Sequence, residues 1–273
     1  MKVIDVIEKQ MMAEEEETRE RRSYWPSEAT MCLRKLFYKW TETQESNPIP
    51  PSGRWKMDMG NAGESVLREW LSKTGLELLG KMKAELDVED LNYPISGEAD
   101  EIINDEKGLL GPIGERVGIE VKTSYGNGVR AIKENGAKDD HVAQCILYMH
   151  MFHTREWRLI YVSRDDGYRL EFVITRDDFG TVYVDGKEFP KSLGNYLDRF
   201  RELEVAVELG KLPDREYRAA IKNGEIKTKF QQDKVEYRTD WQCGYCQFRN
   251  LCWKEELERY ADSTNIEIFA EEE

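Results

Sequence analysis

The sequence lacks a long apolar segment. No uncharged apolar run approaches the roughly 18 residues that a membrane span requires. The N-terminal stretch MKVIDVIEKQMMAEEEETRERR lacks the apolar core of a signal peptide, and it carries too many glutamates for a transit peptide. The sequence therefore predicts a protein without membrane contact, and we expect it in the cytoplasm.

The number of cysteines is odd, so the sequence also lacks a complete set of disulfide partners. The five cysteines cannot all form pairs, and a reducing compartment disfavours disulfides in any case. Ligation of a metal ion or a metal cluster is therefore the leading prediction for their use.

The chain has no overall excess of basic residues. A formal net charge of -14 argues at first sight against a nucleic-acid partner, because binding a polyanion usually requires a basic surface. Much of this charge lies at the two ends: residues 253–273 hold eight acids against two bases, and residues 1–22 hold seven against five. Residues 211–238 hold eight bases against five acids. Local basic patches therefore remain available for a phosphate backbone.

Hydrophobic periodicity predicts an α/β domain between two charged ends. We expect a charged helical extension over residues 1–26, one catalytic domain over residues 27–252 and an acidic tail over residues 253–273. Helices are predicted over residues 27–41 (capped by Ser27), 60–74, 139–153 and 193–207, strands over residues 81–89, 95–103, 116–124, 157–164 and 168–176, and a loop over residues 47–53. Between residues 60 and 176 the order of helix, three strands, helix and two strands predicts a central sheet with helices beside it.

Two carboxylates and a lysine fall on neighbouring predicted strands. Asp100 lies on one strand, and Glu120 and Lys122 lie on the next. Because side chains alternate along a strand, Glu120 and Lys122 leave the same face while Val121 points into the core and leaves its carbonyl free to bind a metal. Carboxylates bind Mg²⁺ or Mn²⁺, and such ions assist phosphodiester hydrolysis. The plainer alternative is a set of ordinary exposed strand charges, since Glu225-Ile226-Lys227 repeats the pattern in a polar stretch.

A resemblance to a known family favours the active-site interpretation. The runs Gly97 to Asp100, Glu120-Val121-Lys122 and Gln144 to Tyr148 appear in the order of the GxxD, ExK and QxxxY motifs, and they resemble the RecB-like branch of the PD-(D/E)XK nucleases. The resemblance extends to Gly60-Asn61-Ala62-Gly63-Glu64, although many members carry a metal-binding histidine where this chain has Glu64. It implies a restriction-endonuclease-like core, an α/β fold with a central mixed sheet flanked by helices.

The resemblance also implies residue roles. Asp100, Glu120, Glu64 and the Val121 carbonyl would bind Mg²⁺ or Mn²⁺, and Asp100, Glu120 and Lys122 would be catalytic. Lys122 would orient the attacking water or stabilise the transition state. Gln144 and Tyr148 lie one turn apart on a helix and would contact phosphate or base. Arg34 and Lys35 follow Cys32, and from this neighbourhood we expect them to line a path for single-stranded nucleic acid.

Four of the cysteines have a three-plus-one spacing. Cys243, Cys246 and Cys252 lie close in sequence, and Cys32 lies 211 residues upstream. A zinc ribbon usually presents two Cys-x2-Cys knuckles, and zinc stays as an alternative. The spacing resembles the iron-sulfur subgroup of the same nucleases, the CRISPR-associated RecB-like exonucleases and the AddB nuclease domain. It implies a 4Fe-4S cluster that links the N-terminal helix to the C-terminal segment. Cys145, inside a core helix, is expected to be buried.

The expected function is metal-dependent hydrolysis of DNA by an exonuclease that prefers single strands or ends. The preference follows from the resemblance. Protein partners in a DNA-processing complex are expected, and the pathway stays open among CRISPR adaptation, recombination, repair and phage replication. Two alternatives remain: a catalytically weak DNA-binding or assembly subunit with the same fold, and a zinc-stabilised interaction protein.

Overall fold

The computed structural model describes residues 2–13, 21–110, 113–232, 235–261 and 267–268, and it forms two compact units. Unit 1 consists of Met1–Thr30 and Pro51–Arg201, and unit 2 of Met31–Pro50 and Glu202–Glu273. The predicted domain boundaries at residues 27 and 252 stay predictions.

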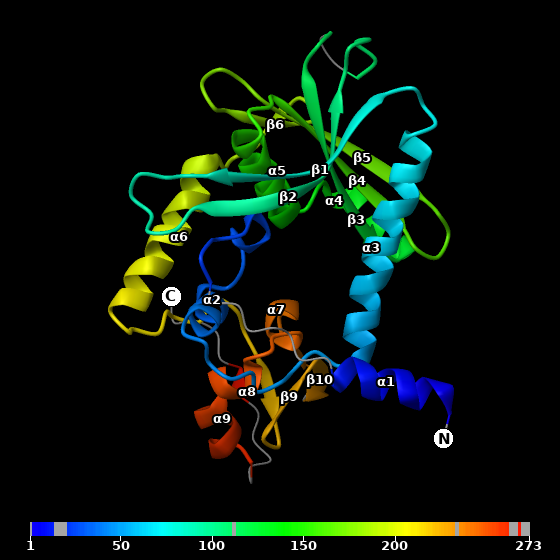
Figure 1. Ribbon diagram of the computed structural model, residues 1–273. Helices are drawn as coiled ribbons and strands as arrows, with labels where there is room; N and C mark the ends of the chain where they lie inside the picture. The colour runs from blue at the N-terminus through cyan, green and yellow to red at the C-terminus, as the bar shows by residue number, and fades with distance from the viewer. Residues whose placement is uncertain (1, 14–20, 111–112, 233–234, 262–266, 269–273) are drawn as a thin grey trace. The chain divides into compact units, whose positions relative to one another are not determined.

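The core of unit 1 is a seven-stranded mixed sheet (Figure 1). Its strands follow chain order: β1 (Glu77–Leu86), β2 (Ile95–Asn104), β3 (Arg116–Ser124), β4 (Glu156–Ser163), β5 (Arg169–Arg176), β6 (Val182–Val184) and β7 (Lys187–Glu188). Neighbouring strands are antiparallel except β3 and β4, which are parallel. A parallel pair needs a long crossover, and α4 (Gly126–Asn135) and α5 (Asp139–Met151) provide it. The predicted α/β fold with a central mixed sheet and flanking helices is confirmed.

Helices cover both faces of this sheet. On one face, Leu67 of α3 (Pro51–Leu71) packs against a cluster that includes Ile119 and Val121 of β3. On the other face, α5 contributes an almost continuous run of buried residues from Val142 to Met149. Alternation along β3 therefore turns Val121 toward α3, and it turns the residues on either side of Val121 toward α5.

Two of the predicted helices begin at the wrong residue. The helix expected from Ser27 is a short 3-10 helix, η1 (Pro26–Glu28), followed by a separate helix, α2 (Leu33–Trp40), with Cys32 as its N-cap. The carboxylate of Glu28 is buried and pairs with Arg21 at 2.6 Å, so tertiary burial fixes a turn where local propensity favours a continuous helix.

The helix expected over residues 60–74 starts earlier, at Pro51, inside the predicted loop. Proline is tolerated in the first turn of a helix because its missing N–H has no partner there. α4 and the small strands β6 and β7 were not predicted. The charged N-terminal helix is present as α1 (Val3–Ala13), and the acidic run from Glu14 to Glu17 lies outside the described residues.

Unit 2 combines short helices and strands around a small core. Its elements are α2, β8 (Ala220–Lys222), β9 (Glu225–Lys227), β10 (Lys229–Gln232), β11 (Val235–Arg238), α7 (Trp241–Gly244), α8 (Arg249–Cys252), α9 (Lys254–Arg259) and β12 (Glu267–Ile268), and α6 (Leu193–Glu208) runs from unit 1 into it. Ala219, Ile221, Trp253 and Tyr260 are buried together. Trp253 and Tyr260 belong to the predicted acidic tail, so the first part of that segment packs into a core. Among the described helices, none has the length and apolar character of a membrane span.

Candidate active site

Asp100 and Glu120 are brought together where the pairing of β2 and β3 ends. The two strands pair from Glu101↔Ile119 onward, and beyond that pair Oδ2 of Asp100 accepts a hydrogen bond of 2.8 Å from the backbone N–H of Val121. The side chain of Asp100 therefore replaces a backbone acceptor. This contact places the Asp100 carboxylate beside Glu120, in agreement with the prediction that the two residues lie on neighbouring strands.

A β-bulge between β1 and β2 lies at the same place. The register shifts between the pairs Gly80↔Ile102 and Met82↔Ala99, so that Lys81 stands opposite two residues of β2, one of them the aspartate of the site. Gly80 has a φ of +86°, a conformation that favours glycine. Bulges re-aim side chains and are frequent next to active sites. Nothing in the strand pattern of the sequence indicated this one.

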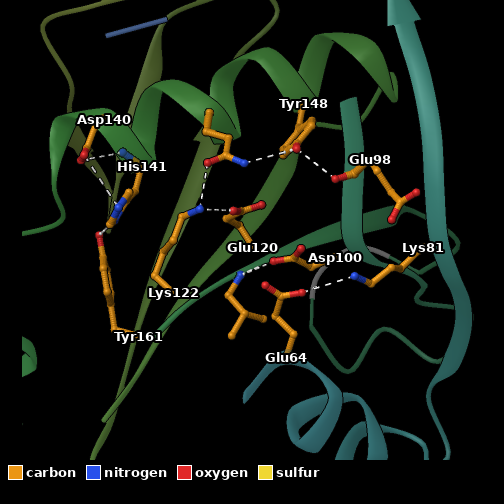
Figure 2. Close-up of polar contacts among 12 residues, drawn as sticks. Glu64, Lys81, Glu98, Asp100, Glu120, Lys122, Asp140, His141, Tyr148 and Tyr161 are labelled. Atoms are coloured by element: carbon orange, nitrogen blue, oxygen red, sulfur yellow. Dashed lines mark hydrogen bonds and ion pairs between the residues drawn. The ribbon is translucent and has the colours of Figure 1, made fainter. Parts of the chain in front are cut away.

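Glu120 and Lys122 leave the same face of β3, as alternation predicted. Oε1 of Glu120 lies 2.5 Å from Nζ of Lys122, and the Glu120 side chain is 3% exposed. Nζ of Lys122 also donates a hydrogen bond of 2.9 Å to Oε1 of Gln144 on α5. The ammonium group is thus held between a carboxylate of the sheet and an amide of the helix that covers it (Figure 2).

Gln144 and Tyr148 continue this chain of contacts. Nε2 of Gln144 donates to the hydroxyl of Tyr148 at 3.2 Å, and that hydroxyl donates to the backbone carbonyl of Glu98 at 2.9 Å. Both side chains are buried, and the ring of Tyr148 stacks on Trp157 with a centroid distance of 5.3 Å. The structure brings the predicted pair to the site. In this arrangement their polar atoms hold Lys122 and β2, whereas the predicted contact with phosphate or base stays a prediction.

Burial and mutual repulsion raise the pKa values of the carboxylates. Burial is the largest cause of the rise in the pKa of Asp100 to about 7, and the charges of Glu120 and Glu64 add to it. Burial also raises the pKa of Glu120, against the lowering effect of Lys122. Burial alone would lower the pKa of Lys122, but the charges and hydrogen bond of its acidic neighbours raise it. The site concentrates negative charge, which favours a bound cation.

The donor set suits a hard divalent metal ion. Oε2 of Glu120 is buried and accepts no hydrogen bond from the residues that the structure describes. Such an oxygen is costly without a partner, and a cation would satisfy it. Glu64 on α3 faces Lys81, with 3.3 Å between Oε2 and Nζ. The carboxylates of Glu64, Asp100 and Glu120 are not arranged as a complete set of metal ligands. Within the described ranges, no three His, Cys, Asp or Glu side chains lie in positions that could hold a metal ion together.

Two positively charged residues of the site, Arg68 and Lys81, lie outside the sequence motifs. A pocket is lined by Glu64, Lys81 and Asp100 together with Arg68 and the apolar side chains beneath them. Nη2 of Arg68 donates a hydrogen bond of 2.8 Å to the Asp100 carbonyl, and Nε lies 3.0 Å from Oε2 of Glu101. Arg68 follows Glu64 by one helical turn, which is a signal that sequence reasoning could have used. Lys81 carries no such signal.

The four predicted cluster cysteines all lie in unit 2. Burial raises the pKa of Cys32 to about 11 and that of Cys243 to about 12. The charge of Cys252 adds to both rises, and Cys32 and Cys246 add to that of Cys243. Among the residues that the structure describes, no three of these thiols are arranged to hold a metal ion. All are free, and Cys145 is fully buried in α5 as predicted.

Hydrogen-bond donors surround these sulfur atoms. The backbone N–H of Phe248 points to Sγ of Cys246 at 3.4 Å, and Nη1 of Arg34 lies 3.7 Å from Sγ of Cys252. Donors of this kind stabilise thiolates, as ligation of a metal cluster requires. The backbone N–H of Asn47 also bonds to the carbonyl of Gln247 at 2.8 Å, so the segment after Cys32 is joined directly to the cysteine-rich segment.

The predicted substrate-binding cations of unit 2 have internal partners. Nε of Arg34 donates to the carbonyl of Pro213 at 2.6 Å, and the charge of Lys35 acts on Cys246. In the basic segment 211–238, Lys227 pairs with Glu225 and Arg238 pairs with Glu236, while residues 233–234 lie outside the described residues. A role of this segment in binding DNA stays a prediction.

Comparison with known proteins gives the fold and no family. No protein-family model matches the chain, and no curated protein sequence matches it. The crystal structure of SSO0001 aligns with a TM-score of 0.53 and 16% identity over 92% of this chain and 96% of that one.

Two structures of an alkaline exonuclease (LHK-Exo) from Laribacter hongkongensis, one in complex with dAMP, align with TM-scores of 0.45 and 16% identity. They cover 70% and 69% of this chain, and 90% and 89% of their own. Structural similarity at a TM-score of 0.45 supports no conclusion about this chain. The chain therefore shares its fold with SSO0001, and its function has to be inferred from the site itself.

Proposed function

We propose that this protein is a metal-dependent nuclease that hydrolyses phosphodiester bonds in DNA. The observation that carries the proposal is the meeting of Asp100, Glu120 and Lys122 at the end of the β2–β3 pairing, with one buried oxygen of Glu120 left without a hydrogen bond. Metal-assisted phosphodiester cleavage uses negative ligands that hold the metal ion and gains from a fixed positive charge beside the phosphate. This arrangement offers both within one sheet.

Glu64, Asp100 and Glu120 would hold Mg²⁺ or Mn²⁺, with the carbonyl of Val121 as a further ligand. The bound ion would supply the activated water and neutralise charge on the phosphate. Lys122 is already fixed by Glu120 and Gln144, so its ammonium group needs little reorganisation to stabilise the transition state. Gln144 and Tyr148 hold Lys122 in place from α5.

The finer assignment rests on the sequence motifs. The GxxD, ExK and QxxxY resemblance supports an exonuclease that acts on single strands or free ends. A 4Fe-4S cluster on Cys32, Cys243, Cys246 and Cys252 is supported by the three-plus-one spacing of the motif, by the placement of all four cysteines in unit 2 and by the donors beside Cys246 and Cys252. Four thiolates are the usual ligand set of such a cluster.

Nuclease assays on labelled DNA test the proposal. Single-stranded and blunt duplex substrates, each labelled at one end, are incubated with purified protein and Mg²⁺ or Mn²⁺, with and without a chelator. Cleavage should require the metal, and Lys122→Ala and Asp100→Ala should each lower the rate by on the order of 10²-fold or more without loss of folding.

A matched control is Lys73→Ala, because Lys73 pairs with Glu69 of α3 at 2.7 Å and does not line the pocket. Lys73→Ala should cleave like the wild type. Equal activity in Lys122→Ala, Asp100→Ala and the wild type would refute the assignment of the site.

A further inference from the structure

Lys81 is a second lysine of the carboxylate site, and the fold aims it there. It is the single residue of β1 that lies opposite the two bulged residues of β2, and it follows Gly80, whose φ is positive. Its Nζ lies 3.3 Å from Oε2 of Glu64, and both residues line the pocket with Asp100 (Figure 2). In a regular strand pairing Lys81 would have one partner residue on β2. The bulge instead places Lys81 opposite Asp100 without a partner in the register, and this position allows its contact with Glu64.

The charge of Lys81 acts on the buried carboxylates. Burial raises the pKa of Glu120, and the positive charge of Lys81 opposes part of that rise. The side chain of Lys81 is 45% exposed, whereas that of Glu64 is 22% exposed. Arg68, the other cation of this pocket, is held by the Asp100 carbonyl and by Glu101. Lys81 is therefore the pocket cation with freedom to move on its flexible four-carbon stem.

A divalent cation and the ammonium group of Lys81 would compete for Glu64. Two positive charges a few ångströms apart repel each other, and the repulsion is strong near a buried site because the effective dielectric constant is low. An ammonium group displaced from Glu64 remains at the mouth of the pocket. It would then be close to the phosphates of a strand bound over the carboxylates.

We propose that Lys81 neutralises Glu64 in the metal-free protein and, once the metal displaces it, binds a phosphate of the DNA beside the cleaved bond. The inference rests on the proposed nuclease function, since it takes Glu64 as a metal ligand and DNA as the substrate. It adds a residue that links metal binding to substrate binding and that lies in none of the sequence motifs.

The test is the variant Lys81→Met, which keeps the length of the side chain and removes its charge. Binding of Mn²⁺ without DNA is measured by calorimetry, and binding of a short single-stranded oligonucleotide is measured at several salt concentrations with Ca²⁺ present. Lys81→Met should bind Mn²⁺ roughly twofold to fivefold more tightly, because a competing charge of a partly exposed ion pair is gone. It should bind the oligonucleotide more weakly, with a salt slope lower by about 0.7.

Opposite shifts for metal and for DNA distinguish this role from a merely structural one. Lys73→Met should change neither quantity, because Lys73 forms a similar ion pair with α3 outside the pocket. If the wild type binds Mn²⁺ and Lys81→Met binds it with equal or lower affinity, the proposal for Lys81 is overturned and the nuclease function stands. Absence of Mn²⁺ binding by the wild type would overturn both.

Discussion

Gln144 accepts a hydrogen bond of 2.9 Å from the ammonium group of Lys122, and this contact joins helix α5 to the strand that carries the candidate catalytic residues. The amide of Gln144 is itself fixed by the hydroxyl of Tyr148, which bonds to β2. Both side chains are buried, so the position of Lys122 depends on a network that spans two strands and a helix. Gln144 is a positioning residue in this arrangement.

Replacing Gln144 by leucine should lower kcat for DNA cleavage by about 10-fold to 100-fold. A hydrogen bond to a charged group contributes about 1.5–3 kcal/mol, and each 1.4 kcal/mol corresponds to a tenfold change in rate. KM should change little, because Gln144 acts through Lys122. Tyr148→Phe should lose less, since it removes only the outer contact. Steady-state kinetics and melting curves measure the effect, and a fully active Gln144→Leu would show that the amide merely packs.

The thermal stability of the metal-free protein should fall as pH rises from about 4 to about 7. The pKa of Asp100 is raised from its ordinary value to about 7, so in this window the folded state holds a proton that the unfolded state releases. Asp100→Asn stays neutral and should remove part of this slope. Its melting temperature at pH 8 with chelator should exceed that of the wild type by about 4 °C or more. Parallel melting curves for both proteins across this pH range would contradict the prediction.

Protein purified without oxygen should contain about four iron atoms per chain, as a four-cysteine cluster of this kind requires. Cys252→Ser should lose the iron and melt at a lower temperature, because the proposed cluster would join two segments of unit 2 that are distant in sequence. Cys145→Ser is the control, since Cys145 is buried in α5 of unit 1 and should not affect iron content. Metal analysis and absorption spectra provide the measurement. Stoichiometric zinc without iron would favour the zinc alternative.

Gly118→Ala should lower the free energy of unfolding by about 1–3 kcal/mol, as overpacking of a core does. A methyl group at Gly118 on β3 would overlap the ring of Trp157 on β4, and that ring stacks on Tyr148. Gly194→Ala is the control, because a methyl group there meets no atom closer than 3.9 Å within α6. Denaturant unfolding measures both variants, and equal stability for the two would contradict the packing argument.

The sequence by itself determined the features that depend on local periodicity. Alternation of apolar and polar residues predicted β2 and β3 nearly to the residue, and it placed Glu120 and Lys122 on one face with Val121 on the other. The apolar run of α5 was equally readable, because a continuous buried stretch of that length is typical of a core helix.

Only the tertiary structure decided the features that depend on how separate elements meet. The bulge that aims Lys81 at Glu64 arises from a register shift between two strands, and a register is set by packing across the whole sheet. The same holds for Gln144, whose helical position was predicted but whose hydrogen bond to Lys122 was not. A periodic pattern fixes which face of an element a side chain leaves. The partner it meets there is fixed by long-range packing, which no local window of sequence contains.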